Sequence, residues 1–233
     1  MTPEEKYIAD HSSPLTDAQR WIIRQTHIRT NHARMLSGAV QGRFLTMLVE
    51  LTGAARILEL GTFTGYSAVC LAMGLPEGGH LDTLEVNDEL EDLILEGFRR
   101  AALEDRITLH VGDAKEILGS LGKSARSAAS SCPSAGSPAA PQGGSAALYD
   151  MVYIDANKRE YCMYYDLVFD LVRPGGLILA DNVLWDGKVF QEPLPRDRQT
   201  AGIASFNDMV ASDPRVESVI LPLRDGLNVI RKR

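Results

Sequence analysis

The sequence predicts an α/β domain built on a mostly parallel sheet, and three observations lead to this prediction. Short apolar runs alternate with segments of helical periodicity, which is typical of strand–helix–strand units. One run, residues 57–60, passes through two glycines, Gly61 and Gly65, into a helical pattern near Ser67. Several other runs end in acidic residues, which would then meet at one edge of the sheet. A chain of 233 residues fits one such domain, covering residues 1–233.

Composition narrows the class of protein. Hydrophobic residues make up 45% and charged residues 24%, as in globular proteins. A net charge of −7 argues against a nucleic-acid binder, and no apolar run reaches the roughly 20 residues that span a bilayer. The three cysteines, Cys70, Cys132 and Cys162, lack the spacing of a metal or redox pair, and we interpret them as free thiols. With an acidic N-terminus unlike a secretory signal, a cytoplasmic protein is expected.

The first part of the chain carries helix signals. Thr16 and Asp17 offer N-cap chemistry before the apolar residues that follow, and residues 1–34 are expected to form an N-terminal helical lid segment. Residues 41–51 have apolar side chains at helical spacing.

From residue 57 onward strands and helices alternate. The expected strands are 57–60, 80–85, 107–111, 149–155, 177–182, 216–223 and 227–231. The expected helices are 68–73, 88–103, a segment ending at 121, 161–172 and 202–211. The last two strands flank Asp225-Gly226, which favours a hairpin, so an antiparallel pair should close the sheet. Residues 173–176, with one proline and two glycines, are expected to form a turn.

Residues 123–147 interrupt this alternation. They are rich in Ser, Ala, Gly and Pro and show no periodic apolar pattern. We interpret them as a flexible low-complexity insertion. A linker between two domains is the alternative, but the alternation resumes directly afterwards.

The glycine turn and two acids predict a cofactor site. A strand, a glycine-rich turn and a helix N-terminus bring free backbone N–H groups together. Glu85 ends the next strand, 24 residues after Gly61, at the spacing of an acid that binds ribose hydroxyls. Taken singly, each glycine is a turn residue and each glutamate a surface charge. As a set with Glu59, they favour cofactor binding.

The glycine spacing bears on which cofactor binds. Gly61-x-x-x-Gly65 differs from the Gly-x-Gly-x-x-Gly of pyrophosphate binders. Glu59 would repel a pyrophosphate but suits the ammonium group or hydroxyls of S-adenosylmethionine. Asp113 and Ala114 follow the third strand, where an adenine amine could be accepted. The pattern therefore favours S-adenosylmethionine over NAD, which is the alternative for a sheet of this type.

A second group of side chains predicts a metal site. Asp155 and Asp181-Asn182 end two predicted strands, which would lie roughly 4.8 Å apart if adjacent. Carboxylate and amide oxygens are hard donors that suit Mg²⁺, Mn²⁺ or Ca²⁺. Alternatively, Asp181-Asn182 caps a turn and Asp155 forms a salt bridge with Lys158 or Arg159.

Lys158 is the candidate general base. It follows Asp155 by three residues, and a nearby cation would disfavour its ammonium form. The alternative is an exposed, ion-paired lysine. Trp21, Tyr161 and Trp185 could form the walls of an aromatic substrate site, although core packing would explain each of them.

At this point the sequence resembles a known family. Residues 57–67, 149–158 and 179–185 resemble the cation-dependent O-methyltransferases, which include caffeoyl-CoA and catechol O-methyltransferase-like enzymes. The resemblance runs from about Met35 to the C-terminus, apart from the insertion. It implies a Rossmann-like class I methyltransferase fold: a seven-stranded, mostly parallel sheet with a C-terminal antiparallel hairpin, helices on both faces, and usually a homodimer.

The resemblance also implies functional residues. Asp155, Asp181 and Asn182 would bind the metal, Mg²⁺ first among the candidates, and Lys158 would be the catalytic base. The residues implied to contact S-adenosylmethionine are Ser37, Glu59, Gly61, Thr62, Ser67, Glu85 and Ala114, to which we add Asp113 and Asp155. One departure is Asn157, where the family has an aspartate. The expected reaction is metal-dependent methylation of one hydroxyl of a vicinal dihydroxy aromatic. A cofactor-binding protein without turnover is the non-enzymatic alternative.

Overall fold

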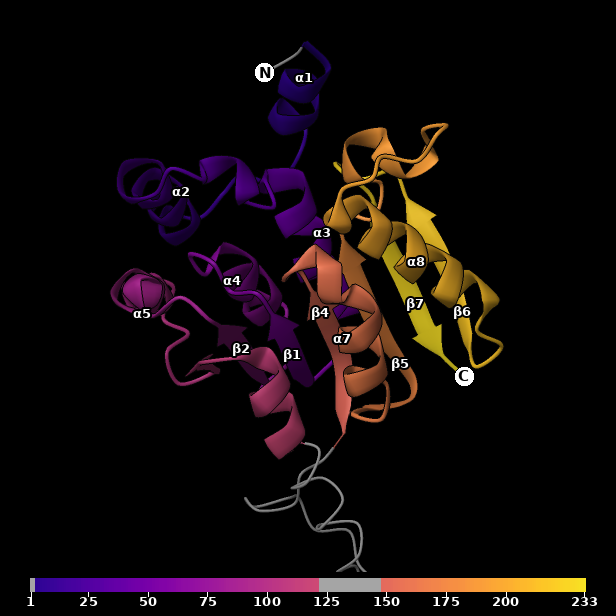
Figure 1. Cartoon of the computed structure of the whole chain (residues 1–233). Coiled ribbons are helices and arrows are strands. Elements are labelled where there is room, and N and C mark those ends of the chain that lie inside the picture. Colours follow the sequence, from indigo (N-terminus) through magenta and orange to yellow (C-terminus); the bar gives the residue numbers. More distant parts are fainter. Residues whose placement is uncertain (1–2, 122–147) are drawn as a thin grey trace, which may run out of the picture.

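The strands form one sheet in the order β3-β2-β1-β4-β5-β7-β6 (Figure 1). The computed structural model describes residues 3–121 and 148–233, and the predicted insertion at 123–147 lies outside these residues. The strands are β1 (Arg56–Leu60), β2 (His80–Glu85), β3 (Ile107–Val111), β4 (Tyr149–Ile154), β5 (Val172–Asp181), β6 (Val216–Leu221) and β7 (Leu227–Lys232). Strands β1 to β5 pair in parallel, and β7 pairs antiparallel with both β5 and β6.

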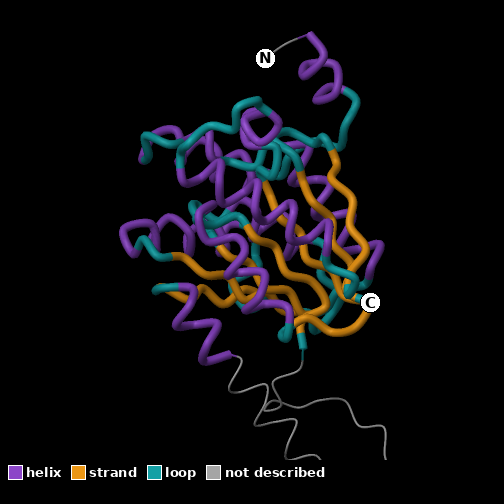
Figure 2. The backbone as a smooth tube through the Cα atoms, turned by 45° about the vertical axis from the view of Figure 1, so that its right-hand side comes forward, coloured by secondary structure: helices purple, strands orange, loops and turns teal. Residues whose placement is uncertain are grey.

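Helices cover both faces of this sheet (Figures 1 and 2). The α-helices are α1 (Pro3–Asp10), α2 (Asp17–Arg29), α3 (Ala39–Thr52), α4 (Tyr66–Met73), α5 (Glu91–Arg100), α7 (Tyr161–Phe169) and α8 (Arg198–Ser212), with a further helix at 114–121. The 3₁₀ turns among the described residues are η1 (Ala33–Met35), η2 (Asp88–Leu90), η3 (Lys158–Glu160) and η4 (Trp185–Phe190). In the described part of the chain, no helix is long and apolar enough to span a bilayer.

Alternation along the strands produces two hydrophobic cores. Successive strand residues point to opposite faces, so Ile57 packs with α2 to α5 while its neighbour Leu58 packs with α7 and α8. Both side chains are fully buried. Near-continuous apolar strands are therefore required, and this is why the short runs were recognisable in the sequence.

Most predicted elements are confirmed, and the differences lie at their ends. Thr16 caps α2 in a capping box with Gln19, as its sequence position predicted. The turn predicted at 173–176 lies inside β5, because Tyr149 pairs with Val172 and Met151 with Leu177, leaving the intervening residues as an irregularity in the ladder. Helix α8 begins at Arg198, earlier than predicted, because the Asp197 side chain accepts from the N–H groups of Gln199 and Thr200.

Two predicted helices are shorter than expected. The segment predicted as one helix over 88–103 begins as η2, and α5 ends at Arg100. The helix predicted over 161–172 ends at Phe169, because β5 already begins at Val172. Apolar side chains beyond both ends pack into the core without being helical, so a burial pattern alone could not mark the boundary.

Candidate functional site

A cavity of about 980 Å³ opens at the carboxyl edge of the sheet. Its walls come from segments far apart in the sequence: residues 34–37, 61–64, 66–67, 155–158, 184–188 and 224–225, with Asn182, Phe190 and Gln199. Ligands in open α/β sheets bind outside the carboxyl ends of the strands, beside the point where strand order reverses. Here that point lies between β1 and β4.

The glycine turn forms one wall of the cavity. Gly61 has a φ of +96°, and a Cβ atom there would lie 2.2 Å from the carbonyl oxygen of Asp155. The N–H groups of Gly61 and Thr62 both donate to the carbonyl of Leu84, at 3.0 and 3.1 Å. Glycine is therefore required at position 61 both by the backbone conformation and by the close approach of β4.

Glu59 is buried beneath this wall. Its side chain has no solvent exposure, and Thr83 donates to Oε2 at 2.5 Å. The other oxygen, Oε1, has no hydrogen-bond partner among the described residues. Burial raises the pKa of Glu59 to about 8, although hydrogen bonds from Ser67 and Thr83 oppose the shift. The carboxyl is therefore protonated below about pH 8 without a ligand, and a positively charged ligand beside it would favour the carboxylate form.

Glu85 closes the other side of the glycine turn. Its two oxygens accept from the N–H groups of Phe63, at 2.7 Å, and Asn87, at 2.9 Å. Each carboxylate oxygen retains a further lone pair for a ligand hydroxyl. The acid predicted from its spacing thus also fixes the shape of the loop.

The predicted cofactor residues are not all at the cavity surface. Ser37, Gly61, Thr62, Ser67 and Asp155 line it, whereas Glu59 and Glu85 do not. Asp113 and Ala114 also lie outside the cavity wall. The Asp113 side chain accepts from the N–H of Lys115 at 2.8 Å, so it caps the helix at 114–121, and Ala114 packs against the core.

Asp155 and Lys158 meet at the opposite wall. Nζ of Lys158 lies 2.6 Å from Oδ1 of Asp155 and 2.8 Å from the hydroxyl of Tyr161. Lys158 is only 7% exposed, so the surface-lysine alternative is wrong, although the ion pair with Asp155 does form. Burial raises the pKa of Asp155 to about 6; Lys158 opposes this shift and Asp181 adds to it.

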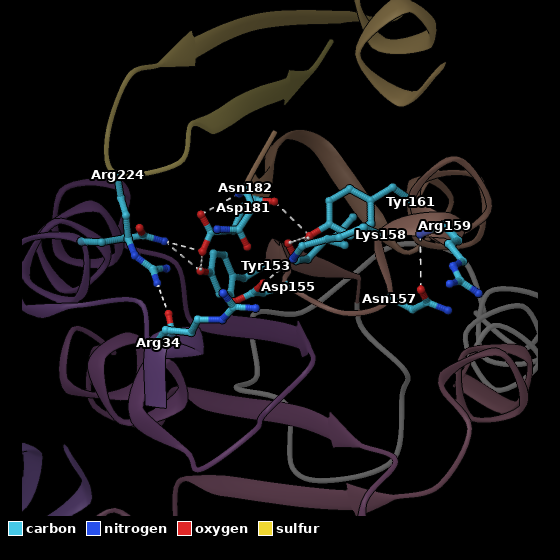
Figure 3. A network of polar contacts seen from close by, with 12 residues as sticks. Arg34, Tyr153, Asp155, Asn157, Lys158, Arg159, Tyr161, Asp181, Asn182 and Arg224 are labelled. Atoms are coloured by element: carbon cyan, nitrogen blue, oxygen red, sulfur yellow. Dashed lines mark hydrogen bonds and ion pairs between the residues drawn. The ribbon is translucent and has the colours of Figure 1, made fainter. Parts of the chain in front are cut away.

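Asp181 lies beside Asp155 but points into a buried polar network (Figure 3). Ile154 pairs with Ala180, so the two aspartates end adjacent strands at the same level. Oδ2 of Asp181 accepts from Nε2 of Gln41 at 2.7 Å and from the hydroxyl of Tyr153 at 2.9 Å. Oδ1 accepts from the N–H of Asn182 at 2.8 Å, and Asn182 has a φ of +60°.

These oxygens fit a hard divalent cation in their chemistry. Two carboxylates and one amide come together, and the charge of Asp181 adds to the raised pKa of Asp155, a repulsion that a cation would relieve. In the described ranges, no three His, Cys, Asp or Glu side chains form a metal-binding group, so the amide of Asn182 is needed to complete the set.

The aromatic candidates have different locations. Trp185 lines the cavity, whereas Tyr161 is fully buried behind it. Trp21 lies beneath the guanidinium of Arg100, 4.5 Å from its ring centre, and outside the cavity wall. Neither Tyr161 nor Trp21 therefore forms a wall of the cavity.

Several residues of the site were missed in the sequence. Gln41 and Tyr153 hold Asp181, and Arg224 donates to the carbonyl of Arg34 at 2.6 Å, which joins two segments of the cavity wall (Figure 3). Tyr153 could have been found, because it precedes Asp155 by two residues and so shares its face of β4. No local pattern marks Gln41, Arg34 or Arg224. Asn157 accepts from the N–H of Arg159 at 3.3 Å and caps η3.

Comparison with known proteins gives a consistent result. The sequence matches the O-methyltransferase family over residues 9–130 and 140–233. A caffeoyl-CoA O-methyltransferase of Eucalyptus globulus is 32% identical over 203 residues, which are 85% of this chain and 75% of that protein.

Solved structures agree with this match. An O-methyltransferase of Bacillus cereus, in complex with S-adenosylhomocysteine, aligns with a TM-score of 0.82 at 28% identity, covering 100% of this chain and 98% of that one. An O-methyltransferase of Streptomyces achromogenes involved in tomaymycin synthesis, in complex with S-adenosylmethionine, aligns with a TM-score of 0.81 at 27% identity, covering 100% and 99%.

Proposed function

The chain belongs to the O-methyltransferase family and is an S-adenosylmethionine-dependent O-methyltransferase, and we propose that it methylates one hydroxyl of a vicinal dihydroxy aromatic with the help of a divalent cation. The observation that carries the proposal is the meeting of Asp155, Asp181 and Asn182 at the carboxyl ends of β4 and β5, beside the buried amine of Lys158. We further propose that the chain acts as one domain, as a homodimer, with residues 1–34 forming a lid.

The glycine-turn wall is the proposed binding site of S-adenosylmethionine. Its residues would be Ser37, Glu59, Gly61, Thr62, Ser67, Glu85, Asp113, Ala114 and Asp155. The free Oε1 of buried Glu59 supports contact with a positively charged group, and the remaining lone pairs of Glu85 support contact with ribose hydroxyls. Support is weakest for Asp113 and Ala114, because Asp113 caps the helix at 114–121 and Ala114 packs against the core.

The proposed cation ligands are Asp155, Asp181 and Asn182, with Mg²⁺ as the first candidate. When bound, such a cation would hold both hydroxyls of the acceptor and make the reacting one more acidic. Gln41 and Tyr153 would keep the carboxylate of Asp181 in place for this role.

Lys158 is the proposed general base. Its Nζ accepts the proton of the acceptor hydroxyl and becomes an ammonium, which Asp155 then neutralises at 2.6 Å. The hydroxyl oxygen forms a new bond to the methyl carbon, while the electrons of the broken C–S bond stay on sulfur. Since the sulfonium is already a good leaving group, the protein contributes mainly positioning.

Metal removal tests this proposal. Protein treated with EDTA and desalted should lose turnover of a catechol, and Mg²⁺ should restore it, while calorimetry shows that S-adenosylhomocysteine still binds. Turnover that persists in metal-free protein would contradict the cation requirement. Complete inactivity with every catechol, with and without Mg²⁺, would instead contradict a vicinal dihydroxy aromatic as the acceptor.

A pair of variants locates the cation. Asp181→Asn should weaken Mn²⁺ binding, followed by electron paramagnetic resonance, at least tenfold. Asp150→Asn is the matched control: Asp150 is a carboxylate at the other end of the same sheet, where it accepts from the N–H groups of Ala55 and Arg56. Equal losses in both variants would argue against the assigned ligands.

A further inference from the structure

The hydroxyl of Tyr161 joins three parts of the site although the side chain has no exposed surface. It lies 2.8 Å from Nζ of Lys158, 3.1 Å from the carbonyl oxygen of Ile154 and 3.0 Å from the carbonyl oxygen of Asp181. Its ring packs edge-on against Phe206, with 5.4 Å between ring centroids. The hydroxyl is therefore held at a fixed point between the ends of β4 and β5.

Chemistry fixes the direction of these hydrogen bonds. Both backbone carbonyls can only accept, so the single proton of the Tyr161 hydroxyl points toward them. The oxygen is then left as an acceptor, and an N–H of Lys158 donates to it. A second N–H of Lys158 donates to Oδ1 of Asp155.

We propose that Tyr161 is a positioning residue that aims the lone pair of the Lys158 amine at the reacting hydroxyl. This inference rests on the proposed role of Lys158 as the base. A neutral amine has two N–H bonds and one lone pair arranged tetrahedrally around Nζ. When Asp155 and Tyr161 take up both N–H bonds, the lone pair occupies the one direction that remains.

On this proposal, the remaining direction is the one toward the cavity. Lys158 lines the cavity wall, whereas Tyr161 lies behind it. The backbone below the amine is also fixed, because Gly202 of α8 packs so closely that a Cβ there would lie 2.6 Å from the carbonyl of Lys158. Without the tyrosine hydroxyl, the amine keeps only Asp155, and both its rotation and its position become free.

Removing only the hydroxyl tests the inference. Tyr161→Phe keeps the ring packing and should lower kcat for a catechol about 10-fold to 100-fold, as expected for a misplaced reacting group. The KM for the acceptor and the affinity for S-adenosylhomocysteine should change by less than about twofold, since neither ligand loses a contact.

Tyr165→Phe is the matched control. Tyr165 lies one turn further along α7, packs against the same Phe206, and donates its hydroxyl to Asp213 at 3.0 Å, away from the cavity. Both variants lose one buried hydroxyl, so thermal unfolding should move by similar amounts. Only Tyr161→Phe should lose kcat. A similar loss of kcat in both variants would mean that the hydroxyl of Tyr161 matters only for stability.

A double-mutant cycle with Lys158→Ala separates positioning from packing. If Tyr161 acts through Lys158, adding Tyr161→Phe to Lys158→Ala should leave the residual rate unchanged. Equal factors of loss in both backgrounds would overturn the inference, as would a Tyr161→Phe enzyme with normal kcat. If Lys158→Ala itself keeps full kcat, the proposed base is wrong, and the inference fails with its premise.

Discussion

The two walls of the cavity are built in different ways. The glycine-turn wall, residues 59–67 with Glu85, is tied to the sheet by backbone hydrogen bonds, and its acid and glycines lie within 27 residues of one another. The opposite wall includes Asp155, Lys158 and Arg224, and Asp181 with its partner Gln41 lies behind it. Its residues are held by side-chain hydrogen bonds from distant segments. One wall is a local motif, whereas the other exists only after distant segments have packed.

Because of this difference, the two walls should differ in their tolerance to substitution. The backbone at Gly61 leaves no room for a Cβ atom, so a substitution there should abolish both folding stability and cofactor binding. The opposite wall is held by individual hydrogen bonds, so a substitution there should remove one contact and lower activity more than stability. Three variants test the comparison, in decreasing order of expected effect.

Gly61→Ala should disrupt the glycine-turn wall completely. The new Cβ would meet the Asp155 carbonyl at 2.2 Å in a backbone region that side chains rarely adopt. We expect a loss of roughly 4 kcal/mol or more in the free energy of unfolding, together with loss of S-adenosylhomocysteine binding in calorimetry.

Gly53→Ala is the control for backbone strain. Gly53 also has a positive φ, +64°, but nothing lies within 4 Å of an added Cβ. It should cost only about 1 kcal/mol. If the two variants unfold at the same temperature, the glycine turn does not depend on the close approach of β4.

Glu59→Gln should change how stability depends on pH. The pKa of Glu59 is about 8 in the folded protein, well above the value of 4.5 for an unperturbed glutamate. The native state therefore binds more protons than the unfolded state between these values, and stability falls as pH rises through this window. Glu59→Gln removes the cost of burying the charge, so at pH 8 it should be more stable than the wild type by on the order of a few kcal/mol.

Urea unfolding without ligand at pH 5, 6.5 and 8 measures this effect. Some pH dependence of the same sign should remain in Glu59→Gln, because the pKa of Asp155 is also raised. Glu50→Gln, which changes an exposed carboxylate on α3, should follow the wild-type profile. If the stability of Glu59→Gln falls with pH as steeply as that of the wild type, the group that binds the extra proton in the native state is not Glu59.

Arg224→Gln should give the smallest effect and only on the acceptor. It removes the hydrogen bond to the Arg34 carbonyl that links the β6–β7 turn with the N-terminal segment in the cavity wall. The KM for the acceptor should rise about tenfold, in line with losing one charged hydrogen bond, while S-adenosylhomocysteine affinity is unchanged. Arg231→Gln, which removes an exposed ion pair with Glu217, should behave as wild type. Weaker cofactor binding in Arg224→Gln would show that the two walls do not act independently.

The sequence predicted the sheet better than the helix ends. Buried parallel strands need apolar runs, so β1, β2 and β4 were recognisable in their short runs. The edge strand β6 is largely exposed, and its hairpin with β7 was indicated by Asp225-Gly226 between them. Helices α5 and α7 end before their apolar patterns do, because side chains just beyond each helix also pack into the core. The proline and glycines at 173–176 indicated a turn, but Val172 and Leu177 on either side of them pair with Tyr149 and Met151 of β4, so these residues form an irregularity within β5.

The candidate site was predicted in outline for the same reason. Asp155 and Asp181 are brought together by the rule that parallel strands end at one edge, which needs no knowledge of side chains. Asp113 shows the limit of that rule: it also follows a strand, yet its side chain turns to cap the next helix. Gln41 gave no signal at all, because its partner Asp181 is 140 residues away.

Local sequence is enough to locate the strands, the glycine turn and the acids that follow strand ends, since each of these features depends on neighbours within a few residues. The atoms that those acids face are set by tertiary packing. It turned Asp181 toward Gln41 and Tyr153, buried Glu59 with one free oxygen, and placed the Tyr161 hydroxyl against Lys158. Hydrogen-bond direction and burial depend on what packs opposite a residue, and that is set by segments far away in the chain.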